Sequence, residues 1–143
     1  MSAGPGQVLF EFVRHWSRRT APDVAEQGRL VLVTESVYAV SARGAATINA
    51  IAHEIGIDQS GASRLVKDAV AAGYLELRPA EADARRREVR VTAAGLLLLE
   101  QAHKWQEEVF TRLTTGWSER RRTQFRRDLL ALLEQSHLSA DWM

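Results

Sequence analysis

Two short helical patterns joined by a tight turn constrain the fold of this chain more than any other feature. Apolar residues at helical spacing predict one helix over residues 48–54, and Gly56 accepts the left-handed conformation that ends such a helix. Asp58 is a good N-cap for a second helix over residues 59–72. The apolar Ile57 between the two helices is expected to be buried. This arrangement predicts a helix-turn-helix.

Helical periodicity extends to both sides of this motif. Amphipathic patterns predict two helices before it, over residues 7–19 and 22–42, and two helices after it. Thr92 caps the first of these later helices, which ends near Gly116, and Ser118 caps the last one. The face of the long helix that is expected to turn inward carries Leu96, Leu99, Ala102, Trp105, Val109 and Leu113.

A short hairpin separates the motif from the last two helices. Residues 74–78 and 87–91 alternate polar and apolar side chains, which is typical of half-buried strands. Pro79 is expected to end the first strand, and the charged loop 80–86 connects it to the second. The predicted fold is therefore mainly α with a small β-hairpin wing, in the element order of a winged helix-turn-helix flanked by additional helices.

Composition excludes several classes of protein. The chain has 143 residues, 45% of them apolar, which is enough for a single domain with its own core. It has no cysteine, so disulfide scaffolds, thiolate metal sites and cysteine nucleophiles are excluded. The first residues lack a basic segment, and no apolar run is long enough for a signal sequence or a membrane span. We therefore expect a cytoplasmic protein without a membrane partner.

The second helix of the motif carries a polar, basic face opposite its apolar residues. Arginine and lysine can contact guanine or phosphate, glutamine can pair with adenine, and short hydroxyl side chains allow close approach. Gly61 costs this helix about 1 kcal/mol relative to alanine, which fits either close backbone approach to DNA or a change without function. The candidate DNA-binding residues on this face are Gln59, Ser60, Ser63, Arg64 and Lys67.

The loop of the hairpin carries a run of arginines. The tip of a winged helix stands beside the recognition helix, so Arg85, Arg86 and Arg87 are predicted to reach phosphates or a narrow minor groove. Asp83 is expected to orient the Arg85 guanidinium through an ion pair. The alternative is a solvated hairpin that balances its own charge.

Several stretches of the sequence match motifs of one known family. They are residues 51–60 with 63–66, residues 73–75 with Arg78-Pro79, and Asp83-Ala84-Arg85 with residues 89–95. The last pair is similar to a D-x-R wing followed by an L-T-x-x-G helix start. On these motifs the chain resembles the MarR family of bacterial winged helix-turn-helix transcriptional regulators, whose length and helix order it shares.

The resemblance implies a homodimer that binds double-stranded DNA. Residues 45–92 would form the winged helix-turn-helix lobe, and residues 7–42 and 93–138 the helical dimerisation region, within one MarR-like domain over residues 1–143. The two recognition helices would enter successive major grooves of a pseudo-palindromic operator, with half-site centres about 34 to 36 Å apart. We expect a transcriptional regulator, typically a repressor, that needs no cofactor. The apolar residues expected at the dimer interface are Trp16, Trp105, Phe110, Phe125, Leu129 and Leu133.

MarR-like proteins are also often released from DNA by small aromatic or phenolic effectors. By this analogy an effector pocket is expected where the DNA lobe meets the dimerisation helices, with His15 or Arg14 meeting an acid group. An aromatic stripe at helical spacing is nevertheless more often part of a core. The residues that the analogy assigns to the pocket are Phe12, His15, Trp16, Tyr38 and Trp105.

Two other classes of protein remain as alternatives. An enzyme is disfavoured because the histidines are widely spaced and no G-x-S-x-G, P-loop or H-E-x-x-H motif occurs. Glu100, His103 and Glu107 have spacings that would allow a metal site, but such spacings usually belong to a solvated helix face, so we expect no metal. The other alternative is a winged helix that binds a protein partner, which would more often expose apolar residues on its second helix.

Overall fold

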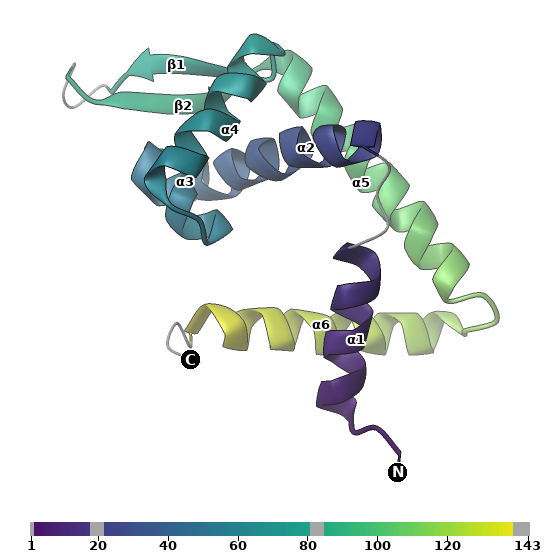
Figure 1. The fold of residues 1–143 in the computed structure, drawn as a ribbon. Coiled ribbons are helices and arrows are strands. Elements are labelled where there is room, and N and C mark those ends of the chain that lie inside the picture. The colour runs from purple at the N-terminus through teal and green to yellow at the C-terminus, as the bar shows by residue number, and fades with distance from the viewer. Residues whose placement is uncertain (1, 18–21, 81–84, 139–143) are drawn as a thin grey trace. The chain divides into compact units, whose positions relative to one another are not determined.

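The computed structural model describes residues 2–17, 22–80 and 85–138 (Figure 1). Its elements, in chain order, are α1 (Pro5–Ser17), α2 (Pro22–Ser41), α3 (Ile48–Ile55), α4 (Gln59–Ala71), β1 (Leu75–Pro79), β2 (Arg87–Val91), α5 (Ala93–Leu113) and α6 (Glu119–Leu138). Each predicted helix and strand is confirmed, and the fold is mainly α with a two-stranded hairpin. The chain divides into two compact units, Met1–Ala102 and His103–Met143. No helix in the described ranges is both long and apolar enough to cross a membrane.

The first unit has a buried core around the helix-turn-helix. Side chains from α2, α3, α4 and both strands meet there, and β2 packs against α2 as well as against β1. The β2 backbone is also tied to the segment before α3, because the Val89 N–H donates to the Ala46 carbonyl oxygen at 2.9 Å. The residues of this core that are at most 2% exposed are Val33, Val37, Ile51, Val66, Ala69, Leu75 and Val89.

The turn between α3 and α4 has the capping interactions that its sequence predicts. Gly56 adopts a φ of 82° and ends α3, and its N–H donates to the Ala52 carbonyl oxygen at 2.9 Å. The Asp58 carboxylate accepts a hydrogen bond from the Gly61 N–H at 3.1 Å and so caps α4. These interactions fix the direction in which α4 leaves the turn.

The hairpin differs by one residue from its prediction. β1 begins and ends one residue later than expected, so Pro79 is its last paired residue and lies opposite Arg87. Proline is tolerated there because it stands at the end of an edge strand, where its missing N–H removes no ladder bond. The next residue closes the loop, since the Ala80 N–H donates to the Arg86 carbonyl oxygen at 2.8 Å.

The start of α5 is fixed to the end of α4. The Thr92 N–H donates to the Tyr74 carbonyl oxygen at 3.0 Å. The Thr92 hydroxyl donates to the Gly73 carbonyl oxygen at 2.6 Å and accepts from the Gly95 N–H at 3.1 Å, which confirms Thr92 as a cap. A Cβ atom on Gly95 would overlap the Tyr74 carbonyl oxygen and lie 2.7 Å from Val91 Cγ1. Only glycine fits this close contact.

The first turns of α5 bury only part of the predicted face. Leu99 is buried as predicted, together with Leu98, whereas Leu96, which was expected to turn inward, is 49% exposed. The buried face begins at Gly95, and residues three and four positions further along a helix lie on the same side as the first. The close contact at Gly95 therefore sets which leucines are covered.

The second unit consists of the end of α5 and of α6, joined by a turn at Gly116 with a φ of 86°. The Ser118 hydroxyl accepts from the Arg121 N–H at 3.1 Å and caps α6, as predicted. The Arg122 guanidinium donates to the Thr114 hydroxyl at 2.9 Å and to the Thr114 carbonyl oxygen at 3.0 Å. This arginine from α6 therefore gives a second donor to the carbonyl just after α5, which also accepts from the Trp117 N–H at 3.0 Å.

Aromatic side chains pack across the same turn, yet the terminal helices bury little. Phe110 and Phe125 stack with ring centroids 6.0 Å apart, and Trp117 meets Phe125 edge-on at 5.4 Å. No residue of α6 is buried, and the same is true of α1. Leu113 and Trp105, the latter also expected at a dimer interface, are 52% and 57% exposed. The residues described within each unit therefore leave these apolar faces uncovered.

Candidate nucleic-acid interface

α4 has a buried side and an exposed side, as the sequence predicts for a recognition helix. Ala62, Val66 and Ala69 are at most 1% exposed and face the core. Among the candidate DNA-binding residues, Ser63 is partly buried and the others are exposed. The exposed ones are Gln59, Ser60, Arg64 and Lys67.

The hairpin lies beside α4 and extends away from the helices (Figure 1). Its tip is basic, because Arg85, Arg86 and Arg87 are all exposed. The predicted partner of Arg85 cannot be placed with them, since Asp83 lies outside the described residues. The structure therefore brings a basic wing tip and a polar recognition helix into the same unit.

Two of the three arginines in the hairpin strands are paired with glutamates. Cross-strand register places Glu76 opposite Arg90, and Arg78 opposite Glu88. Within each strand the acid also pairs with the arginine two residues away on the same face, at 2.8 Å for Arg78 with Glu76 and 4.0 Å for Arg90 with Glu88. Among the described residues, no ion pair involves Arg86 or Arg87. The positive charge that is left for a ligand is thus concentrated at the tip.

Ile57 is exposed, which contradicts the prediction that the turn buries it. Its backbone is fixed, since its N–H donates to the Ala52 carbonyl oxygen at 3.0 Å. Its side chain is nevertheless 38% exposed. The reason is that Ile57 precedes the Asp58 cap at the outer end of the turn, where the core elements do not cover it.

Gly61 has a structural role that the sequence alone did not reveal. A Cβ atom at this position would lie 2.7 Å from Asp58 Oδ1 and 3.5 Å from Ile57 Cδ1. The same Asp58 oxygen accepts the Gly61 N–H. Glycine therefore leaves room for the capping carboxylate over the first turn of α4.

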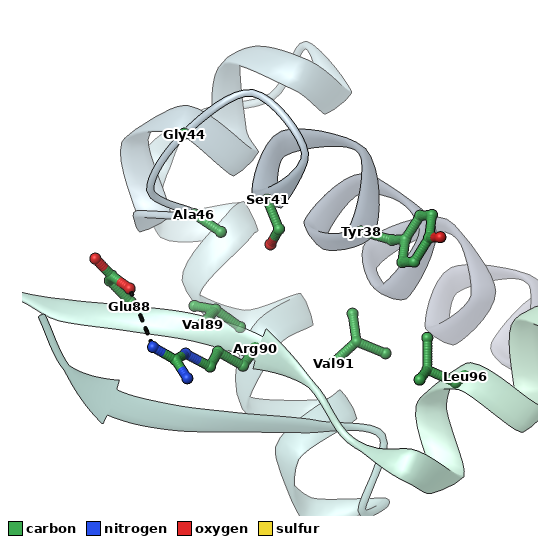
Figure 2. Close-up of a pocket in the computed structure, with 9 residues that line it drawn as sticks. All are labelled: Tyr38, Ser41, Gly44, Ala46, Glu88, Val89, Arg90, Val91 and Leu96. Atoms are coloured by element: carbon green, nitrogen blue, oxygen red, sulfur yellow. Dashed lines mark ion pairs between the residues drawn. The ribbon is translucent and has the colours of Figure 1, made fainter. Parts of the chain in front are cut away.

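A pocket of about 370 Å³ lies between the end of α2, strand β2 and the start of α5 (Figure 2). Of the residues predicted to bind an effector, Tyr38 lines it, whereas Phe12, His15, Trp16 and Trp105 do not. Sequence reasoning missed its other residues because periodicity does not show which face of a strand meets which helix. The pocket is lined by Tyr38, Ser41, Gly44, Ala46, Glu88, Val89, Arg90, Val91 and Leu96.

The aromatic residues of α1 contact one another on the helix surface. Phe12 and Trp16 have ring centroids 6.3 Å apart, and His15 meets Trp16 edge-on at 6.2 Å. All three side chains are exposed. Their predicted role in effector binding stays a prediction.

The alternative metal site considered from the sequence is not formed in the described part of the chain. No group of three or more histidine, aspartate or glutamate side chains there could hold a metal ion. Glu100, His103 and Glu107 are exposed along α5. They form no such group.

The architecture of α2 to β2 defines a winged helix-turn-helix, and solved structures share it. The chain is similar to a mutant of MepR from S. aureus, with 21% identity, a TM-score of 0.66, and coverage of 90% of this chain and 96% of MepR. It is also similar to BpsR from Bordetella bronchiseptica, whose DNA binding is regulated by 6-hydroxynicotinic acid (21% identity, TM-score 0.64, coverage 92% and 94%). A further similar structure is the S. aureus MepR–DNA complex, with 21% identity, a TM-score of 0.60, and coverage of 89% of this chain and 93% of MepR.

Residues 37–86, which span the end of α2, the helix-turn-helix and strand β1 but not β2, match the model of the MarR family. The match over these residues confirms the resemblance to the MarR family that was predicted from the sequence. The structures similar to the chain include a MarR family transcription regulator. The match supports the prediction of a regulator rather than an enzyme. No curated protein matches the chain.

Proposed function

We propose that the protein is a DNA-binding transcription regulator whose helix α4 reads the major groove. The observation that carries this proposal is the division of α4 into a buried apolar side and an exposed side of polar groups, which are amide, hydroxyl and basic over the first turns and include the acidic Asp68 near the end. A protein-binding face would need exposed apolar residues at its centre, and within α4 no large apolar residue is exposed. The family match and the MepR–DNA complex support the same conclusion.

The proposed roles of the α4 residues follow from their side chains. Arg64 can donate two parallel hydrogen bonds to guanine, and Gln59 can pair with the edge of adenine. Lys67, about one turn further along, is suited to a phosphate or a guanine acceptor. Ser60 and Ser63 are short, so they let the backbone of α4 approach the base edges.

The wing would hold DNA by charge rather than by sequence. Arg86 and Arg87 are exposed at the tip. Arg78 and Arg90, further along the strands, are already paired with glutamates. Arginines at such a tip can contact phosphates or enter a narrow minor groove, where negative potential is strongest. Arg85 is proposed to join them, oriented by Asp83.

A homodimer is proposed because the terminal helices leave apolar faces uncovered. Leu129, Leu133 and Trp105 are 44%, 52% and 57% exposed. Exposed apolar faces of this kind mark association sites, and a twofold-symmetric dimer would cover the same face on both chains. Trp16, at 38% exposure, belongs to the same set. Phe110 and Phe125 already stack on each other, so they would support such an interface as well as contribute to it.

Release by a small effector is proposed to use the pocket beside β2. The pocket offers the Tyr38 ring and the Leu96 side chain as apolar walls, and its polar lining includes Arg90, whose guanidinium pairs with Glu88 at 4.0 Å (Figure 2). An anionic effector would have to compete with Glu88 for this arginine. β2 continues from the wing tip, so a molecule bound here would act on the position of the tip arginines. Repression relieved by such binding is the mode of action we propose.

Selection from a random-sequence DNA library, followed by fluorescence anisotropy across a salt series, tests the proposed function. The wild-type protein should enrich a pseudo-palindromic site and bind it with steep salt dependence. Arg64→Ala should weaken binding about 5- to 150-fold and relax the sequence preference at one position, as expected for the loss of a bidentate contact to guanine. Arg87→Ala should weaken binding to all sequences similarly and reduce the salt slope by about one.

Arg127→Ala is the matched control, because it removes an exposed arginine from α6 and leaves the winged helix intact. It should bind the selected site as the wild-type protein does. If no sequence is enriched and Arg64→Ala behaves like Arg127→Ala, the DNA-reading role is wrong and the exposed face of α4 serves a protein partner.

A further inference from the structure

The exposed side chain of the isoleucine in the turn before α4 has no role in the DNA contacts proposed above. Ile57 lies between Gly56, which ends α3, and Asp58, which caps α4. An apolar residue after a helix-ending glycine commonly packs back on the preceding helix, and this accounts for the covered part of Ile57. It does not account for the 38% that is exposed.

The end of the Ile57 side chain lies close to Gly61. A Cβ atom at position 61 would lie 3.5 Å from Ile57 Cδ1, so the end of the isoleucine side chain rests against the bare first turn of α4. The turn backbone is held by two hydrogen bonds to the Ala52 carbonyl oxygen, from the N–H groups of Gly56 and Ile57. An aliphatic group is thus held at the same end of α4 as the exposed Gln59 and Ser60.

We propose that Ile57 is a specificity-determining residue that contacts the C5 methyl group of a thymine in the major groove. This inference rests on the proposed function of α4. The thymine methyl is the one apolar group that a base edge presents there, and it is recognised by apolar contact rather than by hydrogen bonds. Apart from Ala71 at its C-terminal end, the exposed residues of α4 are polar or charged, so Ile57 supplies the aliphatic contact at its N-terminal end.

Replacement of thymine by deoxyuracil tests this contact, because it removes the methyl group and leaves the hydrogen-bonding edge unchanged. The site selected by the wild-type protein is synthesised with each thymine replaced in turn, and binding is measured by anisotropy. One replacement per half-site should weaken wild-type binding about fourfold, the effect expected for one buried methyl group. Ile57→Ala should bind the thymine and deoxyuracil duplexes equally at that position.

Two further variants make the test specific. Ile57→Val removes only the Cδ1 atom and should reduce the discrimination to about twofold; it also carries the test if Ile57→Ala does not fold. Leu77→Ala is the control, because Leu77 on β1 is 39% exposed and Ile57 is 38% exposed. This variant should still bind the thymine duplex about fourfold more tightly than the deoxyuracil duplex. Melting temperatures of all variants establish that they are folded.

The outcomes separate this inference from the proposed function. If a site is selected but contains no thymine, or if no replacement matters, Ile57 does not read a methyl group although the protein reads DNA. The same conclusion follows if Ile57→Ala and Ile57→Val keep the full fourfold discrimination. If no site is selected at all, the proposed function fails and this inference fails with it.

Discussion

The winged-helix unit and the terminal helices differ in where their apolar residues lie. In the winged helix, Val33, Ile51 and Val66 are at most 1% exposed. In α1 and α6 no residue is buried, and Phe10 and Leu132 are 66% and 51% exposed. Both regions show apolar residues at helical spacing. Periodicity therefore identifies an apolar face, but it does not distinguish an internal core from a surface that a partner covers.

The largest effect is expected from emptying the core of the winged helix. Ile51→Ala should lower the free energy of unfolding by about 4 kcal/mol, because Ile51 is completely buried and its neighbours can collapse only partly. Urea denaturation measures this loss. Ile57→Ala is the matched control, and its cost should stay below about 1.5 kcal/mol since that side chain is partly exposed. If both variants lose the same free energy of unfolding, the exposed fraction of a side chain does not predict its contribution to stability in the winged helix.

A smaller effect is expected at the joint between α4 and α5. Gly95→Ala should destabilise the protein by about 2 to 3 kcal/mol, because its Cβ would overlap the Tyr74 backbone rather than a movable side chain. Gly28→Ala is the control: it lies in α2 with open space around it, and should stabilise the protein by up to about 1 kcal/mol. Thermal unfolding of both variants measures the difference. A neutral Gly95→Ala would mean that α5 can shift away from the hairpin without cost.

The terminal helices should respond to a charge through association rather than through folding of the winged helix. Leu133→Asp should raise the dissociation constant of the proposed homodimer at least about tenfold, since it places a charge in an apolar interface. Analytical ultracentrifugation measures this change. Leu77→Asp, at an exposed apolar position of the wing, should leave the dimer unchanged. If the wild-type protein stays monomeric at high concentration, a homodimer does not cover the exposed apolar faces of the terminal helices.

Local interactions made most of the fold predictable from the sequence. Asp58, Thr92 and Ser118 cap their helices as expected, because a capping side chain bonds to a backbone N–H only a few residues away. The glycines at the ends of helices were equally predictable: Gly56 and Gly116 both adopt positive φ. Signals of this kind lie within a few residues of the position that they determine.

Features that depend on contacts between distant segments were not predictable. Ile57 was expected to be buried, but its exposure depends on which elements reach over the turn. Leu96 was assigned to the inward face of α5, which is set instead by the contact of Gly95 with Tyr74. The pocket beside Tyr38 combines three segments, so no single periodicity reveals it. The polar face of α4 was predictable because its residue types and its period lie in one helix.

Removing a helix cap should lower the free energy of unfolding by a similar amount in the winged helix and in the terminal helices. Asp58→Ala and Ser118→Ala each remove one side-chain bond to a helix N–H, at 3.1 Å in both cases, and should each cost about 1 kcal/mol in urea denaturation. Asp58→Asn keeps a capping acceptor and should restore most of that loss.

The two alanine variants should differ in DNA binding, because only Asp58 fixes the turn that carries Gln59 and Ser60. Anisotropy on the selected site should therefore show weaker binding for Asp58→Ala and unchanged binding for Ser118→Ala. Equal binding by both variants would mean that packing of α4 against the core, and not its cap, holds the reading face in place.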